Sequence, residues 1–280
     1  MPSVNRAMSA LNPIQGFVPV LTFRYRIDEL LIPYVEQLCP AALFSLPELR
    51  HRHGRAFPRV PLLIDSGGYA ALNAQNRVEE EDGLGVLVFA DGTRLSPQDV
   101  HVAQCELAAV GFTLDFPCPK DTDEQERARR NRLSEANALW ALAQPRNFLL
   151  YACVQPGQSA EVYLGAGADG LALGGLAPFS ADRAFLTEQV REARAILPDG
   201  LPLHVLGIGH PESVRAVLAA GATSVDSSSV QRHAASGKTW TGESLPDASV
   251  PEQLRLALSN LLTVQHASVP LYLHPLWGVR

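Results

Sequence analysis

The sequence has few cysteines, and none of them is arranged for metal binding or a disulfide framework. Its four are Cys39, Cys105, Cys118 and Cys153, without CxxC or CxC spacing. Structural zinc sites depend on such close pairs, and disulfide scaffolds need a denser set. We therefore expect reduced, buried thiols and no bound metal.

Long hydrophobic runs are also missing. No stretch approaches the roughly 20 apolar residues of a membrane-spanning helix, and the first residues lack the basic flank and apolar run of a secretion signal. We therefore expect a soluble, cytoplasmic protein with no membrane partner. The hydrophobic content of 46% is nevertheless enough for a large core.

The chain has no general excess of positive charge. Its formal net charge of −6 argues against a broadly basic nucleic-acid-binding surface, because neutralising phosphates takes clustered Lys and Arg. Local basic patches lie at residues 50–59, at 127–132, and at Arg232, His233 and Lys238. In the second patch Glu and Arg interleave at helical spacing, which favours a solvated helix face over about 124–143.

What the chain does contain is an alternation of short apolar runs with helical segments. Runs bounded by Gly or Pro are typical of buried parallel strands, and eight occur, at 17–23, 41–46, 62–65, 112–116, 148–155, 170–176, 202–209 and 223–227. This order predicts an α/β fold, a (β/α)8 TIM barrel forming a single domain over residues 1–280. Pro211 and Gly221 mark the ends of one helix, and a final amphipathic helix follows the loop near 245–250.

A turn at Asp91 and Gly92, between two short extended runs in 86–97, predicts a hairpin inserted between two barrel strands. Such an excursion either carries a binding function or is a plain surface hairpin.

Three of the apolar runs carry an aspartate at or near their end: Asp65 in PLLIDSGGY, Asp115 in VGFTLDFP and Asp226 in ATSVDSSS. In barrel and doubly wound enzymes, ligands bind where strands end. The three carboxylates together therefore indicate an active site. Taken singly, each is as readily explained as a turn, strand-end or helix-cap residue.

Seven segments in chain order resemble the signatures of one family. They are DSGGY (65–69), DGTRLSP (91–97), LDFPCP (114–119), VQPG (154–157), LGGLAP (173–178), VLGIGHPESV (205–214) and VDSSSVQRHAASGKTWT (225–241). In this order they resemble the tRNA-guanine transglycosylase superfamily of queuine and archaeosine tRNA-ribosyltransferases. The resemblance implies a (β/α)8 barrel and a glycosyltransferase that replaces guanine in a polynucleotide by a 7-deazaguanine without breaking the backbone.

The resemblance also assigns roles to residues. Asp226 matches the nucleophile that attacks the ribose C1′, which suits a carboxylate because it can add and leave again. Asp65 matches the acid/base residue, and Asp115 the residue that reads the N–H edge of the purine. Further substrate-binding positions are Ser66, Gln155, Gly174, Gly175, Leu176 and Gly207, with Tyr69 and Leu206 as the two faces of a stacking slot. Arg232 and Lys238 are the expected nucleic-acid contacts.

Departures from the family concern the substrate. The tRNA enzymes carry a CxCxxC-plus-His zinc subdomain after the nucleophile, whereas no cysteine follows Cys153 here. The nucleophile segment reads DSSSVQR rather than carrying a Pro-Thr-Arg, and the glycine turn continues as APFS without an acidic residue. These features favour a compact, zinc-free form similar to the DpdA-like proteins that modify DNA, with a preQ0-like incoming base and no cofactor.

Other interpretations stay open. The substrate could instead be tRNA, or the chain could be a non-catalytic nucleic-acid-binding subunit of such an enzyme. An unrelated barrel enzyme could bind a phosphorylated small molecule through its GIG and GG turns. The family resemblance further implies a homodimer. Flipping a base out of a duplex costs a few kcal/mol, which favours a helper subunit as the other possibility.

Overall fold

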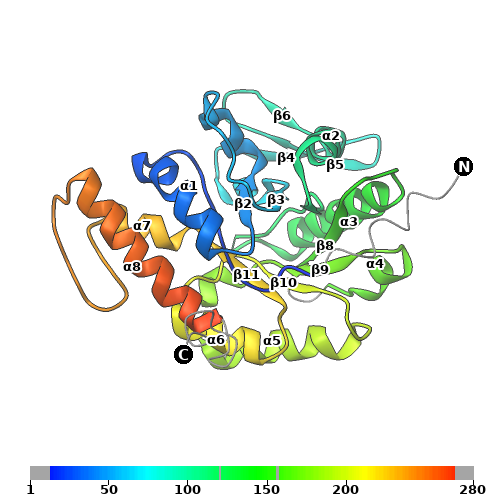
Figure 1. The fold of residues 1–280 in the computed structure, drawn as a ribbon. Coiled ribbons are helices and arrows are strands. Elements are labelled where there is room, and N and C mark those ends of the chain that lie inside the picture. Colours follow the sequence, from blue (N-terminus) through cyan, green and yellow to red (C-terminus); the bar gives the residue numbers. More distant parts are fainter. Residues whose placement is uncertain (1–12, 120, 156–157, 269–280) are drawn as a thin grey trace, which may run out of the picture.

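The computed structural model describes residues 13–119, 121–155 and 158–268, and its centre is a parallel sheet of eight strands (Figure 1). The sheet order is β1-β11-β10-β9-β8-β7-β3-β2. An isolated parallel bridge between Val20 and Leu43, with a hydrogen bond of 2.9 Å from the Leu21 N–H to the Leu43 carbonyl, brings the two outer strands together. The sheet is thereby nearly closed, which confirms the predicted barrel. The strands are β1 Gly16–Pro19, β2 Ala42–Ser45, β3 Leu62–Asp65, β7 Val110–Phe112, β8 Leu149–Val154, β9 Gly170–Leu173, β10 Leu203–Val205 and β11 Ser224–Ser227.

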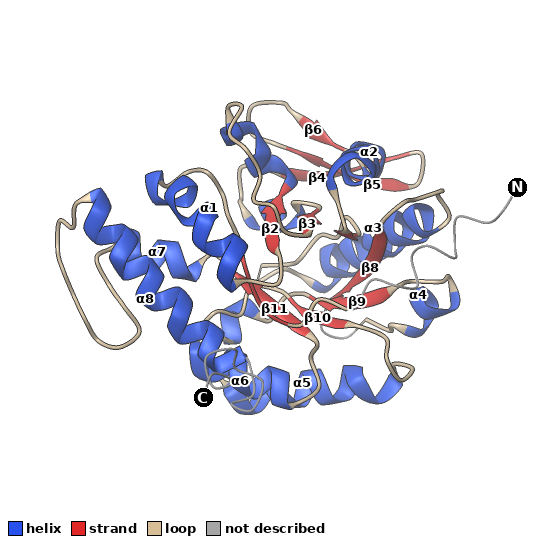
Figure 2. Ribbon diagram, viewed as in Figure 1, coloured by secondary structure: helices blue, strands red, loops and turns tan. Residues whose placement is uncertain are grey.

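Helices cover the outside of the sheet (Figure 2). They are α1 Arg26–Leu38, α2 Pro97–Leu107, α3 Glu124–Leu142, α4 Glu161–Gly165, α5 Arg183–Ile196, α6 Pro211–Ala219, α7 Ser229–Ala235 and α8 Val250–Ser268, with 3₁₀ turns η3 Leu46–Arg52, η4 Gly68–Leu72 and η5 Ala177–Phe179. The predicted helices at 124–143, after Pro211 and at the end of the described chain are confirmed. None of the helices that the structure describes is both long and apolar enough to cross a membrane.

Several predicted strands extend too far, because each apolar run continues into the turn that follows the strand. The run 112–116 becomes β7, which already ends at Phe112, so Asp115 lies in the loop beyond the strand. The runs ending at 176 and 209 stop early at glycines, since Gly175 and Gly207 have φ angles of +69° and +79° that turn the chain away from the sheet.

The predicted hairpin is confirmed and is part of a larger insertion between β3 and β7. β5 Leu84–Val88 and β6 Arg94–Leu95 flank the turn at Asp91 and Gly92, and β4 Arg77–Glu81 adds a third antiparallel strand. The β4 segment, RVEEE, has no recognisable strand pattern because only Val78 in it is buried.

Three apolar layers hold these parts together. Aliphatic and aromatic side chains fill the barrel interior, among them Leu63, Phe112 and Tyr151. A larger layer lies between the strands and the helices, and a third joins the insertion to α3. The four cysteines are free; Cys39 and Cys153 are buried, whereas Cys105 and Cys118 are only half-buried.

Asn137 ties the insertion to the barrel by hydrogen bonds from a fully buried side chain. Its Oδ1 accepts from the Gly85 N–H at 2.8 Å, and its Nδ2 donates to the carbonyls of Gly85 at 3.1 Å and Leu114 at 3.2 Å. Gly85 has no room for a side chain, because a Cβ there would overlap the Phe116 ring.

We expect Asn137→Ala to lower the free energy of unfolding by about 2 to 3 kcal/mol, because it leaves buried backbone groups without partners. Urea denaturation measures the change, with Glu135→Ala at an exposed position of the same helix as control. An Asn137→Ala protein as stable as the control would show that these bonds contribute no net stability.

Candidate active site

The parallel sheet gathers the predicted site residues at one edge. Asp65 ends β3 and Asp226 lies near the end of β11. Asp115 and Gln155 follow β7 and β8, and the other predicted substrate-binding positions follow β3, β9 and β10. The three carboxylates interact electrically, since the charge of Asp226 contributes to raising the pKa of Asp65, and that of Asp65 contributes to raising the pKa of Asp115.

Asp226 is almost fully buried and firmly oriented. Its Oδ1 accepts from His204 Nε2 at 2.9 Å and from the Gly207 N–H at 3.2 Å. His204 is completely buried, and its Nδ1 lies 2.8 Å from Ser224 Oγ. Because a carboxylate only accepts, His204 Nε2 is the donor. Both bonds fall on Oδ1, so among the described residues no bond engages Oδ2, the oxygen left for attack on a ligand.

Asp65 is held by two donors from different elements. Its Oδ2 accepts from Ser45 Oγ at 2.9 Å and from the Gly67 N–H at 3.0 Å. Removal of water raises its pKa to about 6, and the nearby Asp226 adds to that effect while Ser45 opposes it. A carboxyl group with this pKa can both release and take up a proton near neutral pH.

Asp115 is buried beside the side chain of Gln155, whose Nε2 donates to its Oδ2. Burial raises its pKa to about 7, and Asp65 contributes to the same direction. Two glycines make this pair possible. A Cβ at Gly68 would overlap the Asp115 backbone oxygen, and one at Gly174 would overlap the Gln155 amide.

The remaining predicted substrate positions differ in what they expose. Tyr69 is 69% exposed, so it is not a core residue, and Leu206 is half-buried above the barrel interior. Their pairing as a stacking slot stays a prediction. Leu176 is 1% exposed and packs in the outer core, so its side chain is not available to a base and only its backbone could make contact.

Ser66 is fully buried and accepts a long hydrogen bond, 3.5 Å, from the Gly68 N–H. Two residues of the VQPG segment, 156–157, lie outside the described residues.

Arg232 and Lys238 are exposed on and just beyond α7, the helix that follows Asp226. Neither belongs to an ion pair with a described residue. The pKa of His233 between them is lowered, first by burial and then by the charges of Arg232, Lys238 and His210. The exposed surface of α7 and of the turn after it therefore carries two positive charges without an ion-pair partner among the described residues.

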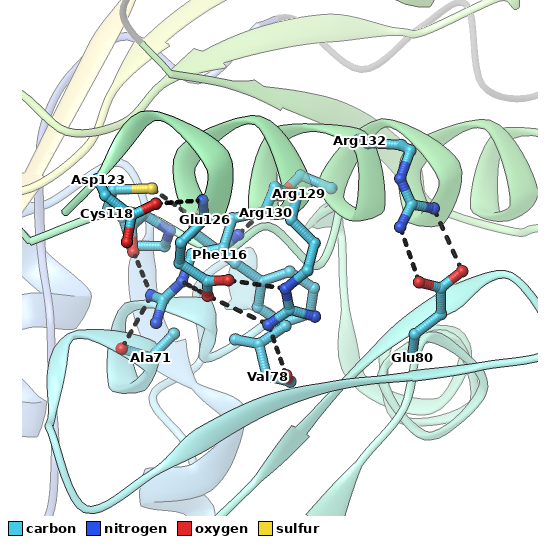
Figure 3. A network of polar contacts seen from close by, with 12 residues as sticks. Ala71, Val78, Glu80, Phe116, Cys118, Asp123, Glu126, Arg129, Arg130 and Arg132 are labelled. Carbon is cyan, nitrogen blue, oxygen red and sulfur yellow. Dashed lines mark hydrogen bonds and ion pairs between the residues drawn. The ribbon is translucent and has the colours of Figure 1, made fainter.

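The other two basic patches are partly paired with acidic side chains. In 50–59, Arg55 pairs with Glu29 at 3.2 Å and Arg52 lies over the Phe57 ring. In 127–132, Arg129 and Arg132 pair with Glu126 and Glu80 on a solvated helix face, as predicted (Figure 3). That interpretation is wrong for Arg130, whose side chain is only 12% exposed because it points between two loops.

Sequence comparison identifies the family of the chain. A model of the family described as queuine tRNA-ribosyltransferase matches residues 51–268. The chain belongs to this family. The matched region contains every predicted site residue.

Curated members of the family are similar at modest identity. A queuine tRNA-ribosyltransferase of Solidesulfovibrio magneticus is 31% identical over 200 residues, 65% of this chain and 52% of the relative. Those of Halothermothrix orenii and Thermotoga maritima are each 26% identical, covering 55% and 65% of this chain and 44% and 53% of their own lengths. The chain thus spans about half the length of the queuine tRNA-ribosyltransferases that it matches.

Sequence reasoning missed two of the groups that orient the carboxylates, Ser45 and His204. Ser45 pairs in register with Asp65 across β2 and β3. His204 is paired with Ser224 in the register of β10 and β11. Both lie within apolar runs, and only the strand register shows what they contact. Within the described part of the chain, no group of three or more His, Cys, Asp or Glu side chains could hold a metal ion.

Asp115→Asn should alter stability in a pH-dependent way. The folded protein holds this proton more tightly than an unfolded chain, with a pKa of about 7 against 3.8. The contribution of protonated Asp115 to folding stability is therefore complete below the pKa of an unfolded chain, and it is lost as the pH rises through 7. At about pH 8 we therefore expect the variant to be more stable than the wild type, on the order of a few kcal/mol, and near pH 4 the advantage should vanish.

Urea unfolding at several pH values measures this effect. Asp199→Asn, at an exposed position, is the control and should show no such trend. A stability difference for Asp115→Asn that is the same at every pH would contradict the assigned protonation.

Proposed function

We propose that the chain is a pentosyltransferase that exchanges guanine in a polynucleotide for a 7-deazaguanine through a covalent bond between Asp226 and the sugar. The observation that carries this proposal is the orientation of Asp226. One oxygen is held by His204 and the Gly207 N–H, and the other is left without a partner among the described residues, beside a carboxyl of pKa about 6. Membership of the queuine tRNA-ribosyltransferase family supports the same reaction.

The reaction needs one nucleophile and one proton carrier. Asp226 Oδ2 adds to C1′ of the sugar while the bond from C1′ to N9 of guanine breaks, and Asp65 in its protonated form gives a proton to the departing base. Asp65 is then a carboxylate and takes the N9 proton of the incoming base. That base attacks C1′, and Asp226 leaves. Asp65 returns to its protonated form, so the cycle needs no cofactor.

Recognition of the base falls to Asp115 and Gln155. As a carboxylate, Asp115 accepts hydrogen bonds from the N1–H and 2-amino group of guanine, an edge that the other bases do not present. Burial raises the pKa of Asp115, and the charge of Asp65 adds to the effect. Hydrogen bonds donated by a bound purine would favour the ionised form.

The proposal also concerns which polymer, DNA or tRNA, is the substrate. The relatives' names point to tRNA. The DSSSVQR segment, which lacks a Pro-Thr-Arg, favours DNA, as in DpdA-like proteins. The turn after Leu176 carries no acidic residue, which suits a preQ0-like base because such a base has no charged aminomethyl group to neutralise. A cytoplasmic location, and assembly as a homodimer or with a helper subunit, belong to the same proposal.

Two alternatives fare less well. A non-catalytic binding subunit would have no need of both Asp65 and Asp226, yet both are present and specifically hydrogen-bonded. A phosphate site at the GIG turn would need free N–H groups, but the Gly207 N–H is directed at Asp226.

Label from radioactive guanine or preQ0 should enter either DNA or tRNA with the wild-type protein. Asp226→Asn should abolish incorporation and the denaturation-resistant adduct between protein and polymer. Asp65→Asn should slow incorporation by about 10²- to 10⁴-fold, the usual contribution of a general acid/base.

Glu135→Gln, at an exposed position far along α3, is the control and should be fully active. Label in only one polymer identifies the substrate. Incorporation that persists in Asp226→Asn would eliminate this mechanism.

Arg232→Gln and Lys238→Gln should each weaken binding of the polymer and reduce its salt dependence. For each phosphate that the variant no longer neutralises, the slope of log K against log salt should shrink by about 0.7 to 0.9. Fluorescence anisotropy at several salt concentrations measures the slope. Arg132→Gln is the control because its charge already pairs with Glu80; slopes equal to wild type in both variants would remove the proposed interface.

A further inference from the structure

Arg130 on α3 differs from its two arginine neighbours in what it contacts. Arg129 and Arg132 reach the inserted hairpin, at the Val78 carbonyl and at Glu80. Arg130 turns inward between two loops instead (Figure 3). Its side chain is 12% exposed, against 56% for Arg132.

The guanidinium of Arg130 joins the loop that follows β3 to the loop that follows β7. Its Nη1 donates to the Ala71 carbonyl at 3.1 Å and to the Pro117 carbonyl at 3.0 Å. Ala71 lies in η4, the turn that also holds Tyr69 and directly follows the Asp65 segment. Pro117 closely follows Asp115. Arg130 therefore connects the chain segments that carry the proposed acid/base residue and the proposed base reader.

Arg130 also forms an ion pair within its own helix. Its Nε donates to Glu126 Oε1 at 2.8 Å, and Glu126 is shared with Arg129. Because its side chain is only 12% exposed and is bonded through Nε and Nη1, Arg130 is poorly placed to contact a phosphate. A planar fork that bonds several acceptors at once is a geometry that lysine cannot reproduce.

Two other side chains on the same face of α3 bond the second loop but not the first. Ser134 Oγ accepts from the Phe116 N–H at 2.9 Å, and Asn137 donates to the Leu114 carbonyl at 3.2 Å. Of these three residues, Arg130 alone also bonds the loop after β3. The two loops are in direct contact, since a Cβ at Gly68 would overlap the Asp115 backbone oxygen. The two loops therefore touch at Gly68 and Asp115, and Arg130 links them by hydrogen bonds from α3.

We propose that Arg130 is a positioning residue that fixes the loop of Asp65 against the loop of Asp115, and so sets the separation between proton transfer and base recognition. The role rests on the proposed base exchange for its catalytic consequence. The structural coupling of the two loops does not depend on it.

The test compares Arg130→Gln and Arg130→Lys with Arg132→Gln, which removes an arginine of the same helix that touches neither loop. Hydrogen–deuterium exchange is followed in peptides covering 66–73 and 114–119. The Ala70 N–H, bonded to the Gly67 carbonyl, and the Phe116 N–H report on the two loops. Arg130→Gln should exchange at least about fivefold faster in both segments, because their opening no longer breaks the shared bonds. Arg132→Gln should match the wild type.

Catalysis supplies the second readout. In Arg130→Gln we expect kcat/KM for the incoming base to fall by about 10- to 100-fold, since small misplacements of reacting groups cost that much. The acidic limb of the pH profile should move to lower pH, because loops that separate weaken the repulsion between Asp65 and Asp115. Arg130→Lys keeps the positive charge but not the planar guanidinium, so its kcat/KM and pH profile should lie between those of Arg130→Gln and the wild type.

The outcomes separate the two proposals. Wild-type exchange in both segments together with an unchanged pH profile would overturn the role of Arg130. If the wild-type protein exchanges no base in any polymer, the proposed function fails, and the exchange rates of the two loops still decide the coupling. Should Arg130→Gln fail to fold, Arg130→Lys carries the same comparison.

Discussion

Three carboxylates within electrostatic reach of one another, two of them buried and Asp65 half-buried, are the constraint around which the catalytic edge is built. Like charges in a water-poor site repel, and each ionised group loses its hydration. The chain answers with directed donors from neighbouring strands and loops: His204 and the Gly207 N–H for Asp226, Ser45 and the Gly67 N–H for Asp65, and Gln155 for Asp115. The donors differ in number and kind from one carboxylate to the next, and the pKa values of Asp65 and Asp115 are raised to about 6 and about 7. The division into nucleophile, proton carrier and base reader that we propose follows these surroundings.

Much of this edge could be predicted from the sequence because its signals are local. Short apolar runs ending in Asp located β3 and β11, and glycines at the ends of other runs marked where the chain turns. The alternation of strands and helices was enough to predict a barrel. The ends of the strands were predicted less well, because an apolar run continues past the last residue that pairs in the sheet. β7 ends before Asp115 for this reason.

Residues whose role comes from distant partners could not be found in that way. His204 lies in the run PLHVLGIG, and its partner Asp226 is 22 positions away. Arg130 lies four residues after Glu126, which is the usual spacing of an ion pair on an exposed helix face. Nothing nearby shows that two loops converge on it. β4 was missed because a strand with one buried side chain carries almost no hydrophobic pattern. In each case the deciding contact is tertiary.

The pairing of β1 with β11 also has a consequence for how the protein folds. β1 pairs with β11, so Phe17 stands opposite Val225, and Gln265 on α8 donates to the Phe17 carbonyl across 248 positions. Of the eight described strands of this sheet, β1 is synthesised first and β11 last, so the edge of β1 that pairs with β11 stays open until then. Contacts of such long sequence separation slow folding. During that interval the unpaired edges of β1 and β10 resemble an open sheet, the form most exposed to association with other chains. Completion of the barrel, and with it the placement of Asp226 against His204, is a late event in the life of each new molecule.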